Sequence, residues 1–125
     1  KYVDEAGSSD FDILLNEATE IIVSPLTRIE MHATMTKCVR EKLLPVEYAE
    51  KLRVEIKKDF VFYSRVYWND DLEEKAVEIT QKSSLKSLDA IQLASGVLSK
   101  ADIFVTSDKK LFEEANKVIR ETRFI

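Results

Sequence analysis

The stretch "LDAIQLASGVLSKADIFVTSDKKLF", residues 88 to 112, predicts a helix, a buried strand and a second helix in direct succession. The strand is expected over residues 102–106, because an apolar run ends there at hydroxyl residues and Asp108 then enters the next helical pattern. The first helix shows helical spacing of four apolar residues, Leu88, Ile91, Ala94 and Leu98. An apolar strand between helices is typical of a parallel sheet that helices cover on both faces.

The rest of the chain continues this alternation of helices and short apolar strands. Residues 20–24, "EIIVS", are predicted to form a second buried strand, and residues 60–68, "FVFYSRVYW", indicate either a strand or a packed connector. The terminal "FI" receives no assignment. The expected fold class is α/β, with three layers in which helices flank a central, mainly parallel sheet. Further helices are predicted at 10–18, 26–42, 45–58, 70–81 and 108–117.

Composition limits the number of domains and the kinds of partner. With 125 residues and 45% hydrophobic content, the chain is expected to form a single domain over residues 1–125. A formal net charge of −4 provides no general basic field, so nucleic-acid binding would need a local patch or a metal ion. Cys38 is the single cysteine, which favours a reducing compartment, by default the cytoplasm. No apolar run is long enough to span a membrane.

Three carboxylates are expected near the carboxyl ends of the strands, where parallel sheets bind ligands. Asp108 follows the last predicted strand, and Glu30 lies in the first turns of the helix after the earlier strand. Asp89 has apolar neighbours, among which an isolated carboxylate is costly unless it is paired, hydrogen-bonded or metal-bound. Hard oxygen ligands suit Mg²⁺ or Mn²⁺, which activate water and stabilise charge on phosphoryl oxygens. The expected chemistry is therefore phosphodiester hydrolysis.

Each carboxylate also has a purely structural interpretation. Asp108 is a preferred type of residue for a helix N-cap. Asp89 suits the positive end of a helix dipole, with Ser87 as the cap. Glu30 can be an exposed helical residue that pairs with Thr34 or with a nearby base.

Other polar residues are expected to be structural. His32 has no second histidine with which to complete a transition-metal site, so we expect a surface or half-buried helical residue. Ser107 lacks a base and is interpreted as a turn hydroxyl. Lys109 and Lys110 are expected on a solvated helix face, where a cation beside a metal site can also contact phosphate.

Three segments resemble the PIN domain family, specifically the VapC-like ribonuclease toxins. They are "LKSLDAIQLASGVLSKADIFVTSDKKLF" (85–112), "VSPLTRIEMHATM" (23–35) and, more weakly, "KYVDEAGSSDFDILL" (1–15). The first of these is the most specific. The resemblance implies a PIN-like fold, cleavage of RNA, a homodimer and a cognate antitoxin protein.

The resemblance also implies roles for individual residues. Glu30, Asp89 and Asp108 correspond to three of the four acids that hold Mg²⁺ or Mn²⁺ in PIN nucleases. Thr106 or Ser107 corresponds to a hydroxyl that supports the metal site by a hydrogen bond. These residues are the expected catalytic and metal-binding set.

The fourth acid of the family can be placed in two ways. "KYVDEAGSS" is similar to a segment that follows the first strand and helix of the family, so the first acid and its strand are expected upstream of Lys1, and the domain is expected to be truncated at its N-terminus. The spacing from Gly7 to "IIVS" favours this alignment. The rival alignment takes "YVD" as a shortened first strand and makes Asp4 the fourth acid.

Alternative functions remain at this point. A PIN-like binding or scaffold module without catalysis is favoured if the first acid is absent. A phosphorylated, receiver-like acidic pocket is less favoured, because no aspartate directly follows the strand at 20–24. Dinucleotide and P-loop sites are disfavoured, because Gly7 and Gly96 are isolated and build no phosphate-binding loop.

Overall fold

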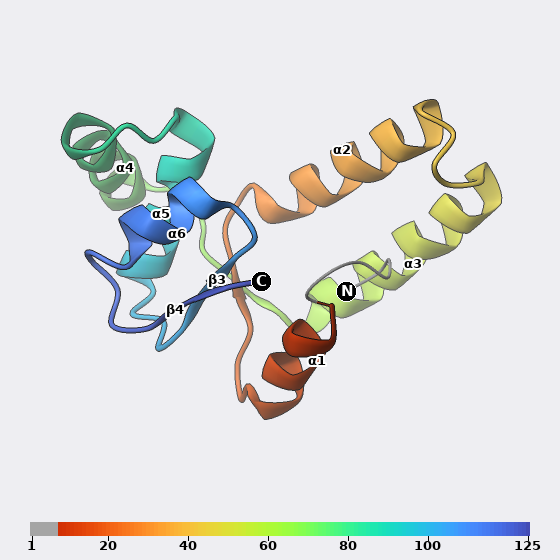
Figure 1. The fold of residues 1–125 in the computed structure, drawn as a ribbon, viewed down its shortest axis with the longest axis horizontal. Coiled ribbons are helices and arrows are strands. Elements are labelled where there is room, and N and C mark those ends of the chain that lie inside the picture. Colours follow the sequence, from red (N-terminus) through yellow and green to blue (C-terminus); the bar gives the residue numbers. More distant parts are fainter. Residues whose placement is uncertain (1–7) are drawn as a thin grey trace.

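A computed structural model describes residues 8–125, so that "YVD" and Asp4 of the rival alignment lie outside the described residues. Helices and short strands alternate along this part of the chain (Figure 1). The helices are α1 (Ser8–Glu17), α2 (Thr27–Arg40), α3 (Val46–Phe62), α4 (Asp70–Lys82), α5 (Ser87–Leu98) and α6 (Lys109–Ala115). The strands are β1 (Ile22–Val23), β2 (Ser64–Arg65), β3 (Phe104–Thr106) and β4 (Thr122–Phe124).

The strands pair as two parallel two-stranded sheets. Ile22 of β1 lies opposite Ser64 of β2, and Val105 of β3 lies opposite Arg123 of β4. The predicted α/β class and the parallel pairing are confirmed, and within residues 8–125 the sheet is divided into two small parts. β4 covers part of the C-terminal segment that the sequence left unassigned, because three residues carry too little pattern to predict a strand.

β1 and β3 each have one edge that forms no hydrogen bonds within its own two-stranded sheet. The amide of Ser64 donates to the carbonyl of Ile21 (2.9 Å), so the backbone groups of Ile22 point away from β2. Likewise, the amide of Phe104 donates to the carbonyl of Glu121 (2.9 Å), and the backbone groups of Val105 point away from β4.

The largest apolar core joins α4, α5 and α6, which lie together in Figure 1. Gly96 allows α5 to lie close to β3, since a Cβ atom at this position would lie 2.7 Å from Cδ2 of Phe104. The predicted apolar face of α5 is only partly right: Ala94 is buried, but Leu88 and Leu98 are 52% and 40% exposed, because the buried face is centred on Ala90, Leu93 and Ala94. The buried members of this core are Leu72, Ala76, Ile79, Leu85, Ala90, Leu93, Ala94, Leu111, Ala115 and Ile119.

The hairpin of α2 and α3 extends away from this core in Figure 1 and has a smaller one of its own, formed by Met35, Leu52, Ile56 and Phe60. The predicted end of the helix near residue 58 is wrong, because α3 continues to Phe62. Leu52, Ile56 and Phe60 recur every four residues and are buried, so packing favours helix over the strand preference of this aromatic segment. β2 then occupies two residues of the predicted strand or connector.

A polar contact also joins the two helices of the hairpin. Nη1 of Arg53 lies 2.7 Å from Nδ1 of His32, and Nη2 of Arg53 donates to Oγ1 of Thr36 at 2.8 Å. His32 is thus half-buried on α2, as its sequence context predicts. No helix within residues 8–125 is long and apolar enough to cross a membrane.

Candidate functional site

Asp108 lies at the junction of β3 and α6 and is the N-cap of that helix. Its Oδ1 accepts a hydrogen bond from the amide of Leu111 at 2.8 Å, so the predicted capping role is confirmed. Oγ1 of Thr106 accepts a hydrogen bond from the amide of Asp108 at 3.0 Å. Thr106 therefore fixes the turn that presents Asp108, and both Asp108 and Ser107 are exposed.

Asp89 lies in the first turn of α5 and is half-buried. The expected cap is wrong: Ser87 is the first helical residue, and the N-cap is Lys86, which makes no side-chain capping bond. Burial raises the pKa of Asp89, and the nearby negative charge of Asp108 raises it further. Lys110 and Lys86 oppose this rise, so two aspartates and two lysines share one electrostatic environment.

Glu30 lies in the first turn of α2, just beyond the carboxyl end of β1. A hydrogen-bonded turn joins the two elements: the amide of Leu26 donates to Oγ of Ser24 at 3.1 Å, and the amide of Ser24 donates to Oγ1 of Thr27 at 3.1 Å. The interpretation that Glu30 pairs with Thr34 or a base is wrong, because its Oε1 accepts a hydrogen bond from Nε2 of Gln92 on α5.

Gln92 lies between two of the predicted acids: it contacts Glu30 and shares a helix face with Asp89. It lies three residues after Asp89 on α5, so both side chains occupy the same face of that helix, one turn apart. Glu30 contacts Gln92, and Asp108 lies close enough to Asp89 to affect its charge. All three predicted carboxylates therefore lie around the N-terminal half of α5. Gln92 was not among the predicted site residues, because its three-residue spacing from Asp89 in "LDAIQ" shows only a shared helix face and not its contact with Glu30.

The donor chemistry of these carboxylates fits a hard divalent cation. Within residues 8–125, no cluster of three His, Cys, Asp or Glu side chains is close enough to hold one ion. Mg²⁺ nevertheless keeps several waters and is often bound through one or two carboxylates. Asp89 and Asp108 are two neighbouring carboxylates whose mutual repulsion a cation would relieve.

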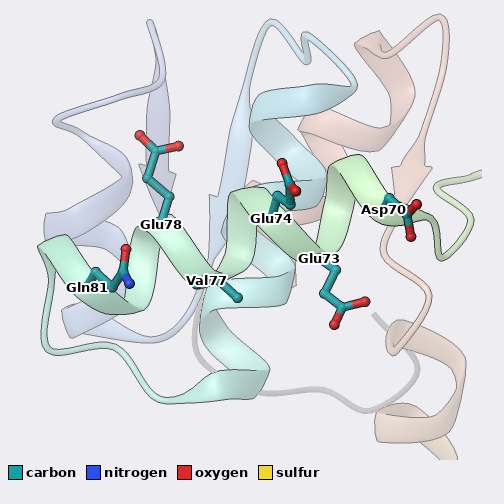
Figure 2. A pocket seen from close by; sticks show the side chains of 6 residues that line it. All are labelled: Asp70, Glu73, Glu74, Val77, Glu78 and Gln81. Carbon is teal, nitrogen blue, oxygen red and sulfur yellow. The ribbon is translucent and has the colours of Figure 1, made fainter.

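A second acidic region lies on α4 (Figure 2). The negative charge of Glu78 is balanced by two lysines, since its carboxylate accepts hydrogen bonds from Lys82 (2.8 Å) and Lys75 (3.2 Å). Figure 2 shows the side chains projecting from one helix rather than converging from several. This exposed face is a solvated helix surface. The residues that line it are Asp70, Glu73, Glu74, Val77, Glu78 and Gln81.

Comparison with known proteins agrees with the fold. The family model described as PIN domain matches residues 2–118. No curated protein matches the chain significantly. PIN domains are generally nucleases and typically use divalent metal ions, and the family favours RNA as a substrate. Because the match covers nearly the whole sequence, the chain belongs to the PIN domain family.

Proposed function

We propose that this protein is a metal-dependent endoribonuclease in which Glu30, Asp89 and Asp108 are the metal-binding acids. The observation that carries the proposal is the setting of Asp89, a half-buried carboxylate close enough to Asp108 to feel its charge; burial first, and then that charge, raises the pKa of Asp89. Two carboxylates in mutual repulsion, one of them half-buried, are costly to a fold that gains nothing from them. Because the chain belongs to a family of nucleases, metal binding is a functional reason for the protein to keep these two carboxylates close together.

Each residue of the proposed site has a distinct role. The chemistry that Mg²⁺ or Mn²⁺ supplies when bound is activation of a water and stabilisation of charge on the phosphoryl oxygen. Asp89 and Asp108 provide negative oxygen ligands, and Thr106 keeps Asp108 at the strand end through the bond to its amide. Ser107 is the neighbouring hydroxyl that can support the same turn. Lys110, which faces Asp89, can contact an RNA phosphate.

The fourth acid is proposed to come from a strand encoded upstream of Lys1. The outward edges of β1 and β3, at Ile22 and Val105, support this proposal, since both strands can accept a further parallel neighbour there. Asp4 is the rival candidate. An upstream sequence with a strand that ends in aspartate supports the first alternative, whereas a start codon immediately before Lys1 supports Asp4.

The nuclease proposal is tested by RNA cleavage with Mg²⁺ or Mn²⁺. Asp89→Asn and Asp108→Asn should each lower the cleavage rate by about 100-fold or more, since even outer-shell changes at metal sites cost about 10–100-fold. Asn keeps the side-chain shape and caps helices well, so the fold should persist. Asp71→Asn is the matched control, because Asp71 is an exposed aspartate in the first turn of α4. Activity that survives both substitutions in EDTA contradicts the proposal.

The cellular role proposed for this nuclease is that of a VapC-like toxin in the cytoplasm, with a cognate antitoxin and a homodimeric state. The resemblance of residues 85–112 to these toxins supports the role. Expression of the chain together with the proposed upstream strand should arrest growth, and Asp89→Asn should relieve the arrest. Size-exclusion chromatography with light scattering tests the dimer. Growth that is unaffected by the active enzyme contradicts the toxin role.

A binding or scaffold module without catalysis is the second candidate. It is favoured by the finding that residues 8–125 contain no preassembled cluster of three metal-binding side chains. In that case partner binding should be indifferent to Asp89→Asn and Asp108→Asn, and neither Mg²⁺ nor Mn²⁺ should support RNA cleavage.

A further inference from the structure

The hydrogen bond between Gln92 and Glu30 connects two parts of the fold that are far apart in the sequence. Nε2 of Gln92 on α5 donates to Oε1 of Glu30 on α2, and both side chains are half-buried. Half-burial favours the bond, because neither group can exchange its partner for water freely. The contact therefore holds the first turn of α2 against α5.

The position of Gln92 on α5 indicates where the hydrogen bond holds the side chain of Glu30. Gln92 and Asp89 occupy one face of α5, and the charge of Asp108 reaches Asp89. A Glu side chain has several rotatable bonds and loses rotamer freedom when it is fixed. By engaging Oε1, the amide of Gln92 restricts Glu30 to conformations in which its carboxylate lies against α5, the helix that carries Asp89.

We propose that Gln92 is a positioning residue that holds the carboxylate of Glu30 against the face of α5 that carries Asp89, and so limits the motion needed for Glu30 to join the aspartates in binding a divalent cation. This inference rests on the proposed nuclease function. Gln92 itself binds neither the ion nor the RNA. It acts on the ligand, as outer-shell hydrogen bonds do at other metal sites, where their loss typically costs about 10–100-fold in metal affinity or activity.

The test compares Mn²⁺ affinity, measured by isothermal titration, with RNA cleavage for the same variants. Gln92→Met keeps the length of the side chain and removes the donor, so Mn²⁺ affinity should fall by about tenfold or more. Gln81→Met is the matched control, since Gln81 is an exposed glutamine on α4, and should leave affinity and cleavage unchanged. Gln92→Ala provides a second variant if methionine disturbs the packing of α5.

A double-mutant cycle separates positioning from a general structural role. In a Glu30→Gln background, Gln92→Met should cause little further loss of Mn²⁺ affinity, because the ligand that Gln92 positions is already gone. Equal loss in both backgrounds, or unchanged affinity in the single variant, overturns the inference. A wild-type protein that binds no Mn²⁺ would instead overturn the proposed function, and this inference with it.

Discussion

The part formed by α4, α5 and α6 and the hairpin of α2 and α3 are held together by different means. The first has a continuous apolar core in which Leu72, Ala90, Ala94 and Ala115 have no measurable exposure. The hairpin has a smaller apolar cluster and a polar contact through Arg53. Its surface also carries exposed apolar side chains, including those of Ile29, Leu43, Val46 and Val54.

This difference matters because the proposed acids are distributed over both parts. Asp89 and Asp108 are placed by elements of the tightly packed part, whereas Glu30 belongs to α2 and contacts that part through Gln92. A well-packed core fixes side chains within a narrow range of positions. The site is therefore expected to be rigid on the side of α5 and α6, and to depend on the hydrogen bond between Gln92 and Glu30 on the side of α2.

The largest effect on stability is expected in the apolar core. Leu72→Ala should lower the free energy of unfolding by about 2–5 kcal/mol, because the leucine is completely buried and the cavity cannot collapse fully. Val77→Ala on the same helix removes a side chain that is 49% exposed and should change stability by no more than about 0.5 kcal/mol. Chemical denaturation measures both. Similar losses for the two variants would mean that α4 is not anchored by this core.

The sequence predicted this packed part better than the hairpin. Helix and strand periods around Asp89 and Asp108 are strong because one face of α5 is buried and β3 follows it closely. The same pattern placed both aspartates at element ends, where the structure has them. Their proximity was also expected, because both were assigned to the carboxyl edge of a parallel sheet, and the effect of the charge of Asp108 on Asp89 agrees with it.

The failures in prediction have identifiable physical causes. The end of α3 was placed too early, because burial of Phe60 overrides the strand preference of "FVFYSRVYW". β4 was missed because its pairing with β3 is a long-range contact without a local pattern. Gln92 was missed because an amide within an apolar helix carries no chemical signature until its partner, Glu30, is located in space.

A smaller effect on stability is expected at Asp108, where the capping role of the side chain can be separated from its proposed metal-binding role. Asp108→Ala should lower the free energy of unfolding by about 1 kcal/mol, because the amide of Leu111 loses its capping acceptor. Asp108→Asn keeps an acceptor and should leave stability nearly unchanged while it removes the charge. Thermal unfolding of both variants gives the comparison. Equal destabilisation by Ala and Asn would show that the charge, rather than the cap, stabilises this turn.

The smallest effect is expected in the hairpin and depends on pH. Arginine is always a donor, so Nδ1 of His32 must be unprotonated to accept the hydrogen bond from Arg53. Burial lowers the pKa of His32, and the charges of Arg53 and Arg28 lower it further. Glu50 lies 3.7 Å from Nε of Arg53 and partly balances that charge.

The sign of the pH dependence follows from these contacts. Because the pKa of His32 is lower in the folded state, the unfolded state binds more protons as the pH falls below about 6.5, and stability is lost in that direction. His32→Gln keeps a possible acceptor for Arg53 and cannot titrate. The free energy of unfolding of the wild type should therefore fall relative to that of His32→Gln between pH 7 and pH 5. Parallel curves would contradict a titrating contact and leave the small apolar cluster as the main support of the hairpin.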